Sequence, residues 1–136
     1  MTTRNSLIPI AYHKDTNTIE IIDQTKLPNT LEKKQLHTSE EVWESIKTLE
    51  VRGAPLIGIT AAYGLAMVAE NITNSSLDAF IADVQKTSDY FLSSRPTAVN
   101  LENCLNRMTV DLDKVQSVEE GKRCLLEKAI FLHQED

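Results

Sequence analysis

The sequence predicts an α+β protein, in which a short N-terminal antiparallel β-hairpin or sheet is followed by a bundle of about five helices. Apolar and β-branched runs separated by turn residues occupy the start of the 136-residue chain. From residue 38 onward, apolar residues recur at helical spacing instead. Hydrophobic residues make up 41% of the chain, which is enough for a buried core. We therefore expect one domain of ordinary size, with residues 1–36 β-rich and residues 37–136 helical.

The β-rich segment is expected to form a hairpin. Residues 7–12 and 18–22 are its two apolar or β-branched runs, and residues 14–17 (KDTN) between them are types that form turns. Residues 23–29 (DQTKLPN) then lead out of the hairpin through another turn.

Capping residues mark where three of the five helices are expected to start. Thr38 with Glu41, and Ser117 with Glu120, have the spacing of a capping box, and Ser76 can cap a third helix. The other two helices are expected from Pro55 to about Glu70 and from about Thr97. The apolar stripes of the amphipathic helices are Val42, Ile46 and Leu49; Leu77, Phe80, Ile81, Val84, Phe91 and Leu92; Leu101, Leu105, Met108 and Leu112; and Val118, Leu125, Ala129 and Leu132.

The charge balance limits the classes of partner. The formal net charge of −6 argues against a broad basic face for nucleic acid. The start of the chain lacks the long apolar core of a signal peptide. The uncharged run 53–69 is just short of a membrane span and contains further glycines, which favours a buried core helix. These features predict a soluble, cytoplasmic protein that binds neither nucleic acid nor a membrane.

The residues that could bind metal or carry out nucleophilic catalysis do not form a pattern. Cys104 and Cys124 lack metal-ligand spacing, and we expect both to be buried free thiols in a reducing compartment. His13, His37 and His133 are expected at the surface or at helix caps, and none lies beside a cysteine or serine as a base would. The residues therefore predict no convincing acid, base or nucleophile in this chain, and the cysteines predict no metal site.

The most informative segment is residues 51–64 (VRGAPLIGITAAYG). Pro55 suits the first position of a helix, and Gly53 lets the backbone come close to a ligand. The N–H groups and dipole of a helix start favour a phosphate, to which Arg52 can add a bidentate contact. An ordinary helix start with a solvated arginine is the competing interpretation, and spacing alone favours it.

A second arginine, Arg95, also stands just before a predicted helix start, where Thr97 could cap the helix. A plain loop arginine is again the simpler interpretation of this feature alone. Two such starts in one small acidic domain favour a shared site for a small phosphorylated ligand. Whether the two arginines meet in space cannot be predicted from their positions in the sequence.

Three segments of the chain resemble landmarks of the methylthioribose-1-phosphate isomerase family. Residues 51–64 closely resemble its signature, residues 94–101 (SRPTAVNL) resemble its second signature, and residues 22–28 (IDQTKLP) are similar to a weaker third landmark. The three occur in the family's order and span most of the chain. The resemblance implies conversion of 5-methylthioribose 1-phosphate into 5-methylthioribulose 1-phosphate in methionine salvage, without a cofactor or metal.

The resemblance also implies that Arg52, Gly53, Ala54 and Arg95 contact the phosphosugar. The family's catalytic cysteine and aspartate belong to a C-terminal nucleotide-binding-like α/β domain, and nothing in this sequence matches them. Residues 1–136 are therefore expected to be the N-terminal domain, inactive by itself, with the C-terminal catalytic domain as its partner. Whether the domain forms a homodimer stays open.

Two other functions stay open. One is a related isomerase of the same superfamily that acts on ribose 1,5-bisphosphate. The other is a non-enzymatic regulatory subunit like those of the eukaryotic initiation guanine-nucleotide exchange factor. The scarcity of further cations near the two motifs disfavours a second phosphate, and the complete pair of arginine motifs favours an enzyme.

Overall fold

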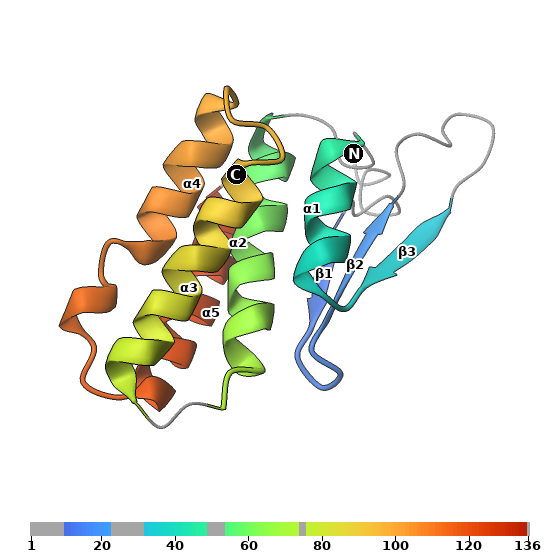
Figure 1. Ribbon diagram of the computed structural model, residues 1–136. Helices are drawn as coiled ribbons and strands as arrows, with labels where there is room; N and C mark the ends of the chain where they lie inside the picture. Colours follow the sequence, from blue (N-terminus) through green and yellow to red (C-terminus); the bar gives the residue numbers. More distant parts are fainter. Residues whose placement is uncertain (1–9, 23–31, 49–53, 74–75, 136) are drawn as a thin grey trace.

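The computed structural model describes residues 10–22, 32–48, 54–73 and 76–135 of the chain. Within these residues, a three-stranded antiparallel sheet comes first and five α-helices follow (Figure 1). The predicted α+β class is therefore confirmed. None of the described helices is both long and apolar enough to cross a membrane.

The sheet has the order β1-β2-β3. Its strands are β1 (Ile10–His13), β2 (Thr18–Ile22) and β3 (Lys33–Leu36). The predicted hairpin is confirmed for its described residues, since Ile10 pairs with Ile21 across β1 and β2, while residues 7–9 lie outside them. The sequence does not predict β3 as a strand, because Leu36 is the one apolar residue in β3. Leu36 lies opposite Ile19 of β2. The pairing with β2 makes β3 a strand.

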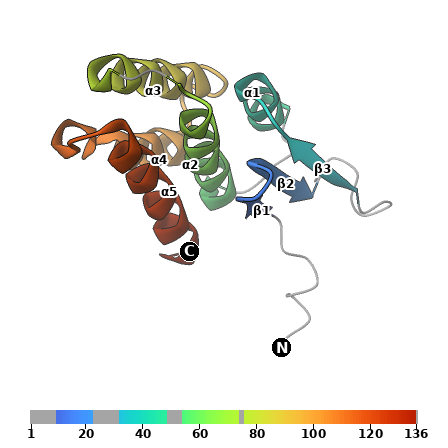
Figure 2. The same ribbon diagram turned by 90° about the horizontal axis from the view of Figure 1, so that it is seen from below.

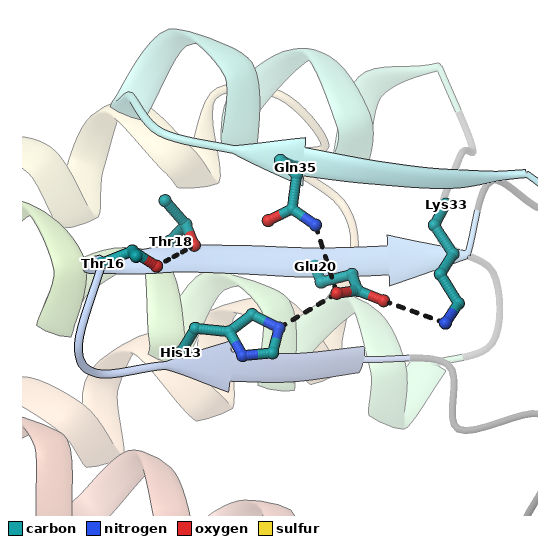
Figure 3. A network of polar contacts seen from close by, with 6 residues as sticks. All are labelled: His13, Thr16, Thr18, Glu20, Lys33 and Gln35. Atoms are coloured by element: carbon teal, nitrogen blue, oxygen red, sulfur yellow. Dashed lines mark hydrogen bonds and ion pairs between the residues drawn. The ribbon is translucent and has the colours of Figure 1, made fainter.

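One face of the sheet carries a polar network centred on Glu20 (Figure 3). The Glu20 carboxylate accepts hydrogen bonds from His13 Nε2 at 3.0 Å and from Gln35 Nε2 at 3.1 Å, and Lys33 Nζ lies 3.4 Å away. These contacts, that of His13 foremost, hold the pKa of Glu20 below its ordinary value. One carboxylate thus joins all three strands.

The helices begin close to the predicted positions. They are α1 (Ser39–Lys47), α2 (Ala54–Glu70), α3 (Leu77–Leu92), α4 (Val99–Thr109) and α5 (Val118–Glu135), with a short 3₁₀ turn, η3 (Leu112–Lys114), before α5. The hydroxyls of Thr38, Ser76 and Ser117 accept from the backbone N–H three residues on, at 3.1, 3.3 and 3.1 Å. The three predicted caps are therefore confirmed. Leu112, expected on the fourth helix, instead lies buried in η3.

Helix α2 lies at the centre of the molecule. Figure 2 shows it with α3, α4 and α5 to one side and with the sheet and α1 to the other. Close packing here depends on glycine: a Cβ at Gly64 would lie 2.9 Å from Phe91 Cε2, and one at Gly58 would lie 2.5 Å from Asn100 Oδ1. The second contact brings the first half of α2 directly against the first half of α4.

An aromatic cluster attaches the hairpin to the helices. The rings of Tyr12 and Tyr63 stack with centroids 5.6 Å apart, and the Tyr63 hydroxyl lies 2.8 Å from His133 Nδ1. In the hairpin turn, Asn17 has a φ of 52° and donates to the carbonyl oxygen of Met67 at 3.1 Å. His133, expected at the surface or at a helix cap, lies in the last turn of α5 and is partly exposed, and its ring meets Tyr63 edge-on.

Candidate functional site

Four helix ends meet at one end of the bundle. Figure 1 shows that α1 and α3 end where α2 and α4 begin. Of the four predicted contact residues, Ala54 is the first residue of α2, and Arg95 lies in the connection between α3 and α4. Arg52 and Gly53 lie outside the described residues, so their contribution stays a prediction. The fold thus brings Arg95 to the end of the bundle at which α2 starts.

The Arg95 guanidinium is held by one of its nitrogens. Arg95 Nε donates to the carbonyl oxygen of Ile46 at 2.9 Å, and the side chain is half-buried. Ile46 lies in the last turn of α1, where the partial negative charge of the helix dipole favours a cation. In the described part of the chain, Arg95 has no ion-pair partner. The contact therefore fixes the guanidinium, and no carboxylate among the described residues pairs with its charge.

Helix α4 begins four residues after Arg95. The N-cap residue is Ala98, in an extended conformation and without a side-chain hydrogen bond to the helix. The expectation that Thr97 caps this helix is wrong, since Thr97 belongs to the preceding turn and lies one residue too early. The first N–H groups of α4 are thus not capped by a side chain, and such groups bind anions readily.

A second contact fastens the connection between α3 and α4 to α1. Trp43 Nε1 donates to Ser93 Oγ at 2.9 Å, and this hydroxyl donates to the carbonyl oxygen of Tyr90 at 2.5 Å. The Trp43 and Tyr90 rings also stack, with centroids 5.9 Å apart and an interplanar angle of 20°. The sequence does not predict that Trp43 and Ser93 fasten these elements together, because the two residues are 50 positions apart.

The described residues offer a cavity elsewhere that is poorly suited to an anion. It has a volume of about 550 Å³ and lies between η3 and α5. Two of its three cations, Lys114 and Lys128, are paired with Asp111 at 3.5 and 2.6 Å, and its wall carries the carboxylates of Glu120 and Glu127 beside the third cation, Arg123. Burial raises the pKa of the Cys124 thiol in its wall, which disfavours the reactive thiolate. The region around Arg95 is therefore the better candidate for a phosphate site than this cavity.

Metal binding finds no support in the described ranges. No group of three or more histidine, cysteine, aspartate or glutamate side chains there is arranged to hold a metal ion. Cys104 and Cys124 form no disulfide, as expected, but both are half-buried where full burial was predicted.

Comparison with known proteins extends the likeness over most of the chain. The Initiation factor 2 subunit family matches residues 50–136. Methylthioribose-1-phosphate isomerase from Bacillus cereus (strain ATCC 10987 / NRS 248) is 45% identical over 118 residues, which cover 87% of this chain and 34% of the relative. The namesake from Geobacillus kaustophilus (strain HTA426) is 48% identical over 118 residues, with 87% and 33% covered. The chain thus spans about a third of the length of these curated relatives.

Two solved structures share the fold. The crystal structure of 5-methylthioribose 1-phosphate isomerase from Pyrococcus horikoshii OT3 matches with a TM-score of 0.89 and 32% identity, over 94% of this chain and 36% of that one. The translation initiation factor eIF-2B, subunit delta, from A. fulgidus matches with a TM-score of 0.86 and 38% identity, over 94% and 37%. The fold is therefore similar both to an enzyme and to a subunit of a translation factor.

Proposed function

The chain belongs to the Initiation factor 2 subunit family, and from this premise we propose that it is the N-terminal, substrate-binding domain of a methylthioribose-1-phosphate isomerase. The complete enzyme would convert the aldose 5-methylthioribose 1-phosphate into the ketose 5-methylthioribulose 1-phosphate in methionine salvage. Its partner would be a C-terminal catalytic domain. Relatives with this name that are 41–48% identical to the chain support the proposal.

The observation that carries the proposal is the placement of Arg95. Its guanidinium is anchored through Nε to the end of α1, beside the uncapped start of α4. A phosphate on these groups would accept charge-assisted hydrogen bonds from the guanidinium and from backbone N–H groups. Arg52 and Gly53, which precede α2 in the sequence, would add further contacts to the same phosphate.

The chemistry explains why a second domain is needed. The C1 phosphate blocks ring opening by the usual route, so a proton must be moved between C2 and C1 by a group within hydrogen-bond reach. A guanidinium stays protonated in proteins and cannot act as that proton shuttle. Arg95 can hold the phosphate and stabilise developing negative charge, which is a binding and electrostatic role.

Calorimetric titration of the purified chain tests the binding role. We expect 5-methylthioribose 1-phosphate to bind, and unphosphorylated 5-methylthioribose to bind far more weakly. Arg52→Ala and Arg95→Ala should each weaken binding of the phosphosugar by about 1.5–3 kcal/mol, the scale of a charged hydrogen bond. Equal affinity for the two sugars, or an unchanged affinity in both variants, would contradict the proposal.

Turnover tests the division of labour between the domains. The chain alone should show no isomerisation of 5-methylthioribose 1-phosphate. A chimera in which it replaces the matching third of the Bacillus cereus relative should regain turnover. Detectable turnover by the purified 136-residue chain would refute the assignment of catalysis to a second domain.

A regulatory subunit is the second candidate, because the eIF-2B delta subunit from A. fulgidus matches with a TM-score of 0.86 and 38% identity. Such a subunit has no need to discriminate phosphorylated from unphosphorylated methylthioribose. A well-folded chain that does not distinguish them, and a folded chimera without turnover, would favour this second function.

A further inference from the structure

We infer that Trp43 and Ser93 form a latch that positions Arg95 for the phosphate, so that Trp43 is a positioning residue of the binding site. The latch is defined as the hydrogen bond from Trp43 Nε1 to Ser93 Oγ, 2.9 Å long. The role in binding rests on the proposed function. The effect of the latch on the Arg95 side chain is a property of the fold and is tested separately.

Trp43 and Ile46 are three residues apart in α1 and therefore lie on the same side of the helix. Trp43 holds Ser93, and the carbonyl of Ile46 holds Arg95, two residues further along the chain. Two neighbouring residues of α1 thus form hydrogen bonds with one short stretch of the connection between α3 and α4.

Each hydrogen bond of the Ser93 hydroxyl has a defined direction. The Ser93 hydroxyl donates its own hydrogen to the carbonyl oxygen of Tyr90, so it accepts from the Trp43 indole without competition. The Trp43 ring is also stacked on Tyr90, which limits its rotation. A serine hydroxyl with a fixed donor and a fixed acceptor has one preferred orientation, and the backbone at residue 93 is fixed with it.

Backbone hydrogen bonds link the latch to Arg95. The backbone N–H of Arg95 donates to the carbonyl oxygen of Leu92 at 3.1 Å, and its carbonyl oxygen accepts from Ala98 at 3.0 Å. The turn that begins at the latched Ser93 therefore fixes both the Arg95 backbone and the N-cap residue of α4. If Ser93 is released, we expect the Arg95 Nε contact to Ile46 to loosen and the grip on phosphate to weaken.

Nuclear magnetic resonance of the uniformly ¹⁵N-labelled chain tests the latch without any ligand. In the wild type, the Arg95 Nε–H signal should be protected from exchange with solvent by its bond to Ile46. Trp43→Phe keeps a ring to stack on Tyr90 but removes the donor, and Ser93→Ala removes the acceptor. Both should speed exchange of the Arg95 Nε–H about fivefold, the factor expected for one hydrogen bond. Ser93→Thr, which retains the hydroxyl, should behave like the wild type.

A matched control separates positioning from a general loss of stability. Gly121→Ala would place a Cβ 2.6 Å from Phe80 Cε2, in the contact between α3 and α5. It should lower the unfolding midpoint in urea without changing exchange at Arg95 Nε–H. Unaltered exchange in Trp43→Phe and Ser93→Ala, or the same change in Gly121→Ala, would overturn the latch.

Titration with 5-methylthioribose 1-phosphate tests the role of the latch in binding. Trp43→Phe and Ser93→Ala should each weaken the affinity about fivefold, and the double variant should be no weaker than either single variant, because both break the same bond. If Arg95→Ala weakens binding while the latch variants do not, the inference fails alone. If Arg95→Ala also leaves binding unchanged, or if the chain binds no phosphosugar, the proposed function fails with it.

Discussion

Arg95 is the residue on which the binding proposal depends most, because its side chain can serve two partners at once. A guanidinium has five N–H donors in a rigid plane. One of these, on Nε, reaches the carbonyl oxygen of Ile46 at 2.9 Å. The terminal nitrogens carry the remaining four donors, which match the oxygens of a phosphate. A single ammonium group has no comparable division between an anchored edge and a binding edge.

Arg95→Lys should therefore weaken binding of 5-methylthioribose 1-phosphate almost as much as Arg95→Ala, by about 1.5–3 kcal/mol. Calorimetric titration of the chain measures the effect. Arg107→Lys is the matched control, because Arg107 pairs with Glu135 at the surface and its substitution should leave the affinity unchanged. Wild-type affinity in Arg95→Lys would show that the charge alone is sufficient.

Glu20 gives a prediction about stability and pH. Its pKa is lowered in the folded chain, mainly by the hydrogen bond from His13. The ionised carboxylate therefore stabilises the fold above the ordinary carboxyl pKa of 4.5, and this contribution is lost as the pH falls through the lowered folded value.

Glu20→Gln should accordingly lower the free energy of unfolding by about 0.5 kcal/mol at pH 7, the scale of a partly exposed ion pair. The difference from the wild type should shrink at an acid pH below the lowered folded pKa of Glu20, where the wild-type carboxyl is also protonated. Urea unfolding at the two pH values measures this. A difference that grows on acidification would contradict the assignment.

At the scale of helices and strands, hydroxyl caps fix most of the helix starts. Thr38 accepts from Glu41 N at 3.1 Å, and the Glu41 carboxylate accepts in return from His37 N at 2.6 Å. This interaction is local, so the sequence alone predicts it. At α4, the N-cap predicted from the sequence is one residue too early, because the turn after Pro96 places Ala98 and not Thr97 at the N-cap.

Thr38→Ala should therefore cost about 1 kcal/mol of folding stability, the usual value for a lost N-cap. Thr97→Ala is its matched partner and should change stability by less than about 0.5 kcal/mol, since Thr97 is exposed and caps no helix. Chemical denaturation of the two variants compares them directly. Equal losses of stability would mean that Thr97 has a structural role in solution.

At the scale of the whole molecule, the sheet shares the hydrophobic core with the helices and is also held to them by polar contacts of the hairpin turn. The Asn17 side chain accepts from the Tyr12 hydroxyl at 2.5 Å, and its amide donates to the Met67 carbonyl oxygen at 3.1 Å and to Asn71 Oδ1 at 3.3 Å. Its backbone has a φ of 52°, a conformation in which asparagine and glycine are tolerated. Asn17 thus combines a tight turn with the attachment of that turn to α2.

Two substitutions separate these roles of Asn17. Asn17→Gly retains the backbone conformation but loses the hydrogen bonds, and should lower stability by about 1–3 kcal/mol. Asn17→Ala also strains the backbone and should cost about 1 kcal/mol more. Thermal unfolding followed by circular dichroism measures both. An alanine variant as stable as the glycine variant would contradict the backbone component.

Features that depend on near neighbours in the chain follow from the amino-acid sequence alone. The caps at Thr38, Ser76 and Ser117 each join residues three apart, so they and the helices they start could be predicted before any tertiary contact was known. The sequence also singled out Arg95 by its position before a helix start. Arg52 and Gly53 were singled out in the same way, and their role stays a prediction.

Features that join distant parts of the chain depend on tertiary contacts. Lys33–Leu36 is a strand because β2 supplies its hydrogen-bond partners, not because of its own residue types. Arg95 meets Ile46, 49 residues away, and Trp43 meets Ser93, 50 residues away. Each such contact requires closing a long loop, and the packing of the whole core around α2 compensates that entropy. A local pattern therefore predicts which arginine precedes a helix, and the core determines which groups hold its guanidinium.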